Sequence, residues 1–230
     1  MAAHHLLDRP VWSALTTRQA PLALGDGRAW RFSPEYGPFA AAVDYSPGNL
    51  AALAVLVPIE GAAAVVETAD IPAPPGTVIV SRAICNQMVA ERLNPVDAGF
   101  EIVPLGEADA PEMLSLATLT KPGPFSTRTH RLGNFIGVKH EGRLVAMAGE
   151  RMKPEGFTEV SGVCTLPDYR GRGYAGGLMR VVAARILARG EMPFLHVYAD
   201  NAEAIALYET LGFRFRRALT MTVIRRKRGD

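Results

Sequence analysis

The sequence predicts a mixed α/β fold whose sheet contains both parallel and antiparallel strands. Three observations lead to this prediction. Short apolar runs typical of strands alternate with stretches whose apolar residues recur at helical spacing. The turn Glu141-Gly142 separates two such runs as a hairpin, which requires an antiparallel pair. With 230 residues, of which 48% are hydrophobic, the chain is long enough to bury a large core.

The chain divides into two parts at a predicted linker, residues 93–99. The first part, residues 1–97, is rich in alanine, proline and glycine, and we expect a smaller α/β domain whose role the sequence does not show. Turn-forming clusters at residues 25–27, 46–48 and 72–76 separate its apolar runs. Residues 78–83 are the clearest strand among these runs.

The second part, residues 98–230, alternates strand and helix patterns along its length. In chain order we expect a strand at 100–105, a helix at 108–118, strands at 135–140, 143–148 and 159–165, a helix after a turn at 171–177, a strand at 194–198, a helix at 201–211 and a strand at 218–225. Pro111 is tolerated because it lies in the first turn of its helix. Gly190 and Gly212 are expected to end the second and third helices.

Composition and charge exclude several classes of protein. Lys and Arg number 25 against 23 Asp and Glu, which gives a net charge of +2. The basic run at 225–228 is a candidate contact for nucleic acid or an acidic partner, but no aromatic residue interleaves it, so a solvated end is expected. The apolar runs are too short to cross a bilayer, and residues 1–30 show no secretory signal. The only cysteines, Cys85 and Cys164, fit a reducing compartment, so we expect a cytoplasmic protein. The histidines and cysteines do not have the spacing of a metal site.

Residues 163–175 carry the strongest chemical signal. A predicted strand runs directly into a glycine-rich turn that opens a helix. Glycines let a ligand approach the backbone closely, and the first amides of a helix lack intrahelical partners and favour an anion. Arg170 and Arg172 add positive charge, so a pyrophosphate is the expected ligand. These arginines disfavour the alternative that the glycines serve only tight packing.

Residues 171–176 also match G-x-G-x-x-G, the fingerprint of dinucleotide-binding folds. That fold needs an acidic residue at the end of the next strand, about 20 positions on. Glu191 precedes its predicted strand, Asp200 is too distant, and too few residues follow Gly176 to complete a doubly wound domain. A dinucleotide-binding oxidoreductase is therefore a less favoured alternative. A P-loop is excluded because no Gly-Lys-Ser/Thr closes the turn.

Two motifs resemble those of a known family. Residues 170–175, Arg-Gly-Arg-Gly-Tyr-Ala, resemble the R/Q-x-x-G-x-G/A signature of the GNAT superfamily of acyl-CoA-dependent N-acyltransferases. Residues 200–213, Asp-Asn-Ala-Glu-Ala-Ile-Ala-Leu-Tyr-Glu-Thr-Leu-Gly-Phe, resemble the family's D-N-x-x-A-x-x-L-Y-x-x-x-G-F element. The motifs stand in the family's order, separated by one helix and one strand. The resemblance covers residues 155–226, can be extended back to residue 100, and is closest to the glycine N-acyltransferase-like C-terminal domains.

The resemblance implies a GNAT-type fold with splayed central strands. Here these strands are residues 159–165 and 194–198, and acyl-CoA is expected in the wedge between them. Acetyl-CoA is the implied acyl-donor substrate, with no metal. Some members of the subgroup have an N-terminal half that resembles a degenerate second copy of the fold. Residues 1–97 are a candidate for such a copy, although they carry no acyl-CoA signature.

The resemblance also implies which residues form the site. The backbone of Val163, Cys164 and Thr165 would pair with the pantetheine arm, and the N–H near Val163 would polarise the thioester carbonyl. Residues expected to hold the pyrophosphate are Arg170, Gly171, Arg172, Gly173, Tyr174 and Ala175. Asn201 would contact the CoA arm. Tyr208, two helical turns further on the same face, would give a proton to the leaving thiolate.

Three of these assignments have alternatives. Glu159, on the strand facing the acyl site, is expected to act as general base directly or through a water, but a surface Glu at a strand start fits nearly as well. Tyr208 also suits a core position beside Leu211. Cys164 and His196 fall on strands expected to be adjacent, but a Cys–His nucleophile is rejected because the family transfers the acyl group directly.

We therefore expect an N-acetyltransferase in which a primary amine attacks acetyl-CoA directly. A non-catalytic acyl-CoA-binding module is the main alternative. The acceptor is expected to be a small-molecule or peptide amine, and neither nucleic acid nor a membrane is an expected partner. The sequence does not identify the acceptor, because acceptor pockets are built from variable loops. It does not show the oligomeric state either.

Overall fold

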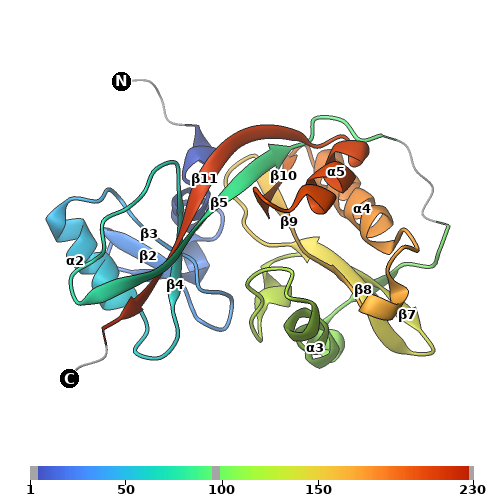
Figure 1. Ribbon diagram of the computed structural model, residues 1–230, viewed down its shortest axis with the longest axis horizontal. Helices are drawn as coiled ribbons and strands as arrows, with labels where there is room; N and C mark the ends of the chain where they lie inside the picture. Colours follow the sequence, from blue (N-terminus) through green and yellow to red (C-terminus); the bar gives the residue numbers. More distant parts are fainter. Residues whose placement is uncertain (1–4, 95–98, 228–230) are drawn as a thin grey trace.

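The computed structural model describes residues 5–94 and 99–227. The α-helices are α1 (Pro10–Thr16), α2 (Pro47–Leu56), α3 (Ala110–Thr120), α4 (Tyr174–Ala188) and α5 (Ala202–Leu211). Short 3-10 helices are η1 (Leu6–Asp8), η2 (Ala20–Leu22), η3 (Glu107–Asp109), η4 (Thr129–Leu132) and η5 (Pro167–Tyr169). The strands are β1 (Ala23–Gly25), β2 (Ala29–Phe32), β3 (Ala40–Ala42), β4 (Ala63–Glu67), β5 (Thr77–Val89), β6 (Val103–Leu105), β7 (Phe135–His140), β8 (Arg143–Glu150), β9 (Phe157–Thr165), β10 (Met192–Tyr198) and β11 (Arg214–Arg226). Two lobes are joined by a long ribbon that β5 and β11 form (Figure 1).

Within the described ranges, the strands form two sheets. The small sheet has the order β1-β2-β3, and the large, eight-stranded sheet has the order β4-β11-β5-β10-β9-β8-β7-β6. In the large sheet β9 and β10 pair in parallel, whereas the hairpin of β7 and β8 and the pairs that β5 makes are antiparallel. The predicted mixed α/β fold with a mixed sheet is confirmed.

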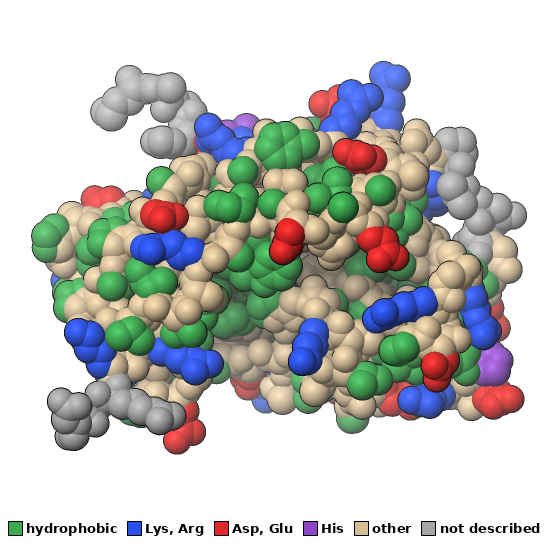
Figure 2. Space-filling model, viewed as in Figure 1, with side chains coloured by type: hydrophobic (Ala, Val, Ile, Leu, Met, Phe, Trp, Pro, Cys, Tyr) green, Lys and Arg blue, Asp and Glu red, His purple; other side chains and the backbone are tan. Residues whose placement is uncertain are grey.

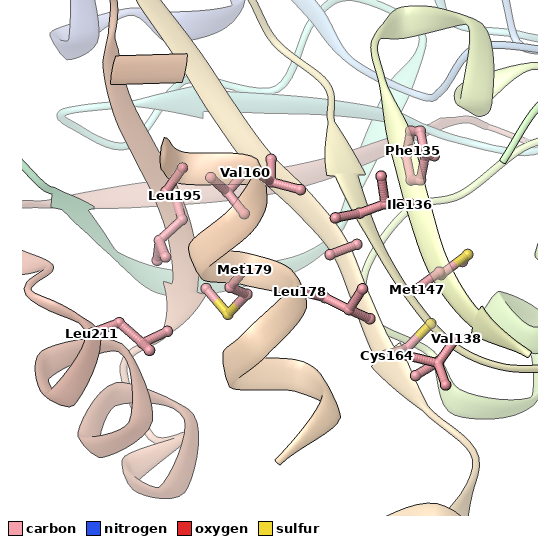
Figure 3. Packing of buried hydrophobic residues seen from close by; sticks show 14 of the residues in the cluster. Phe135, Ile136, Val138, Met147, Val160, Cys164, Leu178, Met179, Leu195 and Leu211 are labelled. Atoms are coloured by element: carbon pink, nitrogen blue, oxygen red, sulfur yellow. The ribbon is translucent and has the colours of Figure 1, made fainter. Parts of the chain in front are cut away.

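Helices cover both faces of the large sheet around β8. This strand is buried from Leu144 to Glu150, which requires cover on both faces. Both α3 and α4 pack on β8 and β9. Figure 3 shows Leu178 and Met179 of α4 among the buried side chains of these strands, with Val160 and Cys164 from β9. This packing fixes the start of α4 relative to the end of β9.

The two central strands part, as predicted for residues 159–165 and 194–198. The parallel register of β9 and β10 runs from Phe157 opposite Met192 to Glu159 opposite Phe194, and ends there. Beyond this point β10 continues to pair on its other edge with β5, as far as Tyr198 opposite Cys85. The C-terminal half of β9 therefore presents a free edge to a wedge between the strands.

A strand from the first part of the chain completes the large sheet. The strand β5 lies between β10 and β11 and pairs with both. Met88 and Ala90 belong to the core of the second lobe, and Phe194 and Leu219 belong to the core of the first. The division at residue 97 stays a prediction, but the sheet and both cores run across it. Of the predicted linker, residues 95–98 lie outside the described residues.

Several elements differ from their predicted bounds because tertiary pairing extends or shortens them. The predicted strand at 78–83 is the first half of β5, which its pairing with β11 extends to Val89. The predicted strand at 100–105 is only β6, since its pairing with β7 starts at Val103. Gly190 follows the end of α4 at a φ of 76°, and Gly212 caps α5 at a φ of 104°. No helix within the described residues is long and apolar enough to cross a bilayer.

Candidate functional site

A cavity of about 650 Å³ opens between the parted strands. In the space-filling view the surface is hollowed between the two lobes, with hydrophobic side chains on the wall of the hollow (Figure 2). Of the residues that the sequence assigns to the site, those lining the cavity are Glu159, Val163, Cys164, Thr165, Arg170, Gly171, Gly173, Tyr174, Ala175, Asn201 and Tyr208. The structure thus brings together all the predicted site residues except Arg172.

The glycine turn between β9 and α4 forms an open cradle. Gly171 and Gly173 adopt φ angles of 75° and 79°, a region that strains any residue with a side chain. The first backbone bond of α4 runs from the N–H of Gly177 to the carbonyl of Gly173, at 3.0 Å. The amides of residues 174–176 therefore have no partner within the helix. They are available to an anion, and the helix dipole favours it.

The two arginines of the turn differ in position. Arg170 lines the cavity. The guanidinium of Arg172 instead lies over the ring of Tyr169, 4.8 Å from its centroid, and donates to the carbonyl of Asp168 at 3.3 Å. Of the two arginines, only Arg170 places its charge beside a ligand in the cradle. We therefore expect Arg172 to contact the pyrophosphate through its backbone alone.

A β-bulge lies at the middle of β9. Cys164 pairs with Met147 of β8, but the next pair joins Ser161 to Gly149, so β9 holds one extra residue. Gly162 takes a φ of 64° there, and a Cβ at this position would come 2.8 Å from the ring of Phe135. A bulge redirects the backbone groups beside it, which include the N–H of Val163. Gly162 was not among the predicted site residues, although a glycine inside a strand pattern is a signal of a bulge.

Two predicted residues of α5 face the same cavity. The side-chain oxygen of Asn201 caps the helix by accepting from the N–H of Ala204 at 3.1 Å, which leaves the amide N–H groups of Asn201 to donate elsewhere. Tyr208 lies two turns further on, and its hydroxyl makes no hydrogen bond to any described residue. Burial raises the pKa of Tyr208. This phenol therefore holds its proton and is able to donate it.

Glu159 is completely buried in an ion pair with Arg151. Its two oxygens accept from Nε and Nη2 of Arg151, both at 2.8 Å, and Nδ1 of His196 also lies 2.8 Å from Oε1. Burial alone would raise the pKa of this carboxyl, but the charge and hydrogen bonds of Arg151 hold it well below its usual range. A carboxylate that binds protons so weakly is a poor base. The geometry therefore speaks against the predicted general-base role of Glu159.

A chain of buried polar groups connects Glu159 with the first lobe. The side-chain amide of Gln87 donates to the carbonyl of Leu7 at 2.9 Å and lies 3.0 Å from Nε2 of His196, so Nε2 accepts and Nδ1 carries the proton. Arg216 donates to the amide oxygen of Gln87 at 2.9 Å and to Asp8 at 2.7 Å.

A second bulge directs Arg216 into this chain, because the register between β11 and β5 slips between Phe215 and Arg217. Residues 1–97 carry no motif that pointed to Gln87. Its contribution is visible only once β5 pairs with β10.

Cys164 is not arranged as a nucleophile. Burial raises the pKa of its thiol to about 11, and both ring nitrogens of His196 face other partners. The described residues include no group of three or more His, Cys, Asp or Glu side chains that could hold a metal.

Comparison with known proteins supports the resemblance seen in the motifs. A family model described as FR47-like protein matches residues 135–222. N-alpha-acetyltransferase RimI of Mycobacterium tuberculosis (strain ATCC 25618 / H37Rv) is 35% identical over 85 residues, or 35% of this chain and 52% of that protein. The chain thus matches about half the length of this curated relative.

A solved structure from Novosphingobium aromaticivorans DSM 12444, assigned to the GNAT family of acetyltransferases, is 50% identical to the chain. It superposes with a TM-score of 0.89 over 98% of this chain and 100% of that one. The chain belongs to the GNAT family. A GCN5-related N-acetyltransferase from Kribbella flavida, 19% identical with a TM-score of 0.63 over 94% of this chain and 96% of that one, shares the fold with this GNAT protein.

Family membership confirms the resemblance to the GNAT superfamily that the two motifs indicated. As a GNAT protein, the chain belongs to a family of acetyltransferases that use acyl-CoA donors. The nearer resemblance to glycine N-acyltransferase-like domains stays a prediction, as does a degenerate GNAT copy in residues 1–97.

Proposed function

We propose that the protein transfers the acetyl group of acetyl-CoA directly to a primary amine. One observation carries this proposal: a single cavity is lined by the free edge of β9, by the glycine turn that follows it, and by Tyr208. An extended thioester with a phosphate group at one end fits a cavity of this form. The acceptor is a small-molecule or peptide amine that reaches the other end.

The donor would lie along the free edge of β9. Its diphosphate would accept hydrogen bonds from the amides of residues 174–176 and from Arg170. Thr165 lines the cavity, and its buried Oγ1 lacks a hydrogen-bond partner among the described residues. From Thr165 to Glu159 the strand extends for about 20 Å at about 3.3 Å per residue, enough for an extended arm.

The chemistry then follows from the groups at the bulge and on α5. The amine nitrogen bonds to the thioester carbon, and the N–H of Val163 stabilises the negative oxygen that forms. When the C–S bond breaks, Tyr208 gives its proton to the sulfur, and the proton lost by the amine returns to Tyr208 through water. Glu159 and His196 hold the far end of the site in position, since their hydrogen-bonding groups are already occupied.

Replacing Tyr208 with Phe should lower kcat by about 100-fold or more, because the thiolate would have to leave without a general acid. The Kd for acetyl-CoA should not change, since the ring and its packing on Phe213 are kept. Single-turnover thiol release and calorimetry measure the two quantities. An unchanged kcat would show that Tyr208 is a packing residue.

Replacing Arg170 with Ala should weaken acetyl-CoA binding about tenfold or more, through loss of a charge-assisted contact to the diphosphate. Acetyl-pantetheine, which lacks the diphosphate, should bind the variant and the original protein equally. Arg172→Ala is the matched control and should change little, because this guanidinium lies over Tyr169. Equal losses for both variants would place the diphosphate elsewhere.

The overall proposal is tested by measuring thiol release from acetyl-CoA with a panel of amines. Amine-dependent release is expected. Binding of acetyl-CoA without release for any amine would identify a non-catalytic acyl-CoA-binding module. A thermal shift with NADH but not with acetyl-CoA would favour the dinucleotide alternative.

A further inference from the structure

The end of the cavity remote from the glycine turn is formed by the first lobe. Phe39 and Val66 line the cavity there, together with Met221, which is the cross-strand partner of Val66. These side chains pack together in one apolar cluster. The guanidinium of Arg151, which is paired with Glu159, lies 4.6 Å from the centre of the Phe39 ring. Phe39 therefore lies beside the buried Arg151–Glu159 ion pair.

Among the described residues, this end of the cavity offers no unpaired negative charge to an acceptor that carries a second ammonium group besides the reacting amine. The carboxylate of Glu159 is neutralised by Arg151, and the exposed Lys121, which also lines the cavity, is a cation. The other carboxylate among the described lining residues is Glu203, at the start of α5 beside the CoA-binding Asn201. A polyamine would have to leave a second ammonium group without a partner in an apolar pocket, which is costly.

The side chains that line this end expose little surface. Phe39 is 3% exposed, Val66 4% and Cys85 6%, and the segment 121–124 lines the cavity from the second lobe. Cys85 lies close enough to Arg151 and Glu159 to respond to their charges, and burial raises the pKa of its thiol to about 11. An extended polypeptide would need more exposed surface at this end than these three side chains offer.

We propose that the acceptor is a small primary monoamine with an apolar body, and that the first lobe supplies the pocket for that body. The inference rests on the proposed acetyl transfer and narrows its acceptor. The amino group would lie at the thioester near Val163, and the apolar body would contact Phe39, Val66 and Met221. The first lobe, whose role the sequence did not show, thereby determines specificity.

The test compares acceptors at saturating acetyl-CoA. We expect kcat/KM for phenethylamine and hexylamine to exceed the values for spermidine and for a short peptide with a free N-terminus by about tenfold or more, the size of discrimination that an apolar pocket provides. Higher kcat/KM for spermidine or the peptide would overturn the inference and leave the acetyl transfer intact. Acetyl-CoA binding without turnover of any amine would overturn both.

A charge placed in the pocket gives a second test. Met221→Glu supplies a partner for a second ammonium, so the preference should shift towards spermidine by about tenfold or more, with an unchanged Kd for acetyl-CoA. Val223→Glu is the matched control, since Val223 lies two residues further along the same strand and outside the cavity lining, and should shift nothing. Met221→Ala, which only shortens the side chain, should raise KM for phenethylamine. Unchanged acceptor preference in both Met221 variants contradicts the inference.

Discussion

Residues 98–230 produced without the first 97 residues should fail to fold into a protein that binds acetyl-CoA. Removal of β5 leaves β10 and β11 without the strand between them, so both acquire an unpaired edge. It also removes Met88 and Ala90 from the core of the second lobe. Circular dichroism should show no cooperative thermal transition, and calorimetry should show no binding.

Fragment complementation is the control for this prediction. Residues 1–94 supplied as a separate chain contain β5 intact, so mixing the two fragments should restore binding in proportion to their association. A fragment 98–230 that unfolds cooperatively and binds acetyl-CoA as the whole chain does would contradict the prediction. It would also make residue 97 a true domain boundary.

Replacing Glu159 with Gln should lower the free energy of unfolding by about 3–5 kcal/mol, because Arg151 would keep a buried charge without its partner. The pKa of Glu159 lies below its unfolded value of 4.5, so the carboxylate stabilises the fold above that pH and loses the effect as the pH falls. The gap in stability between the two proteins should therefore be widest near neutral pH and narrow below about pH 4.5. Urea unfolding across this range measures it.

Activity separates a structural role of Glu159 from a catalytic one. The shape of the pH–rate profile should not change in Glu159→Gln, because this carboxylate is not the proton acceptor. Glu150→Gln is the matched control, since Glu150 is equally buried, is paired with Lys153 and Arg189, and lies outside the cavity. Loss of a limb of the profile in Glu159→Gln alone would restore the general-base role.

The donor half of the site could be predicted from the sequence because its signals are local. A glycine turn at the end of a strand, followed by a helix with Asn201 and Tyr208 seven residues apart, defines a surface within one stretch of chain. The chain folds this stretch as expected, and the cavity lining contains these residues. The side chain of Arg172 lies over the ring of Tyr169 and outside the cavity lining, a position that the motif alone does not show.

The acceptor half could not be predicted because its residues meet only through long-range pairing. Gln87 reaches His196 across 109 positions of sequence, and only the insertion of β5 brings them together. The protonation behaviour of Glu159 likewise depends on Arg151, a partner that strand alternation does not identify. A local pattern shows that a carboxylate faces a site, but not which charges surround it.

The ribbon of β5 and β11 also limits how the enzyme moves. Its pairing runs from Thr77 and Arg226 in one lobe to Val89 and Arg214 in the other, and only two register shifts interrupt it, between Phe215 and Arg217 and between Val223 and Ile224. Closure by rotation about a hinge would have to bend two hydrogen-bonded strands together. We therefore expect the two lobes to keep their relative orientation when a substrate enters the cavity.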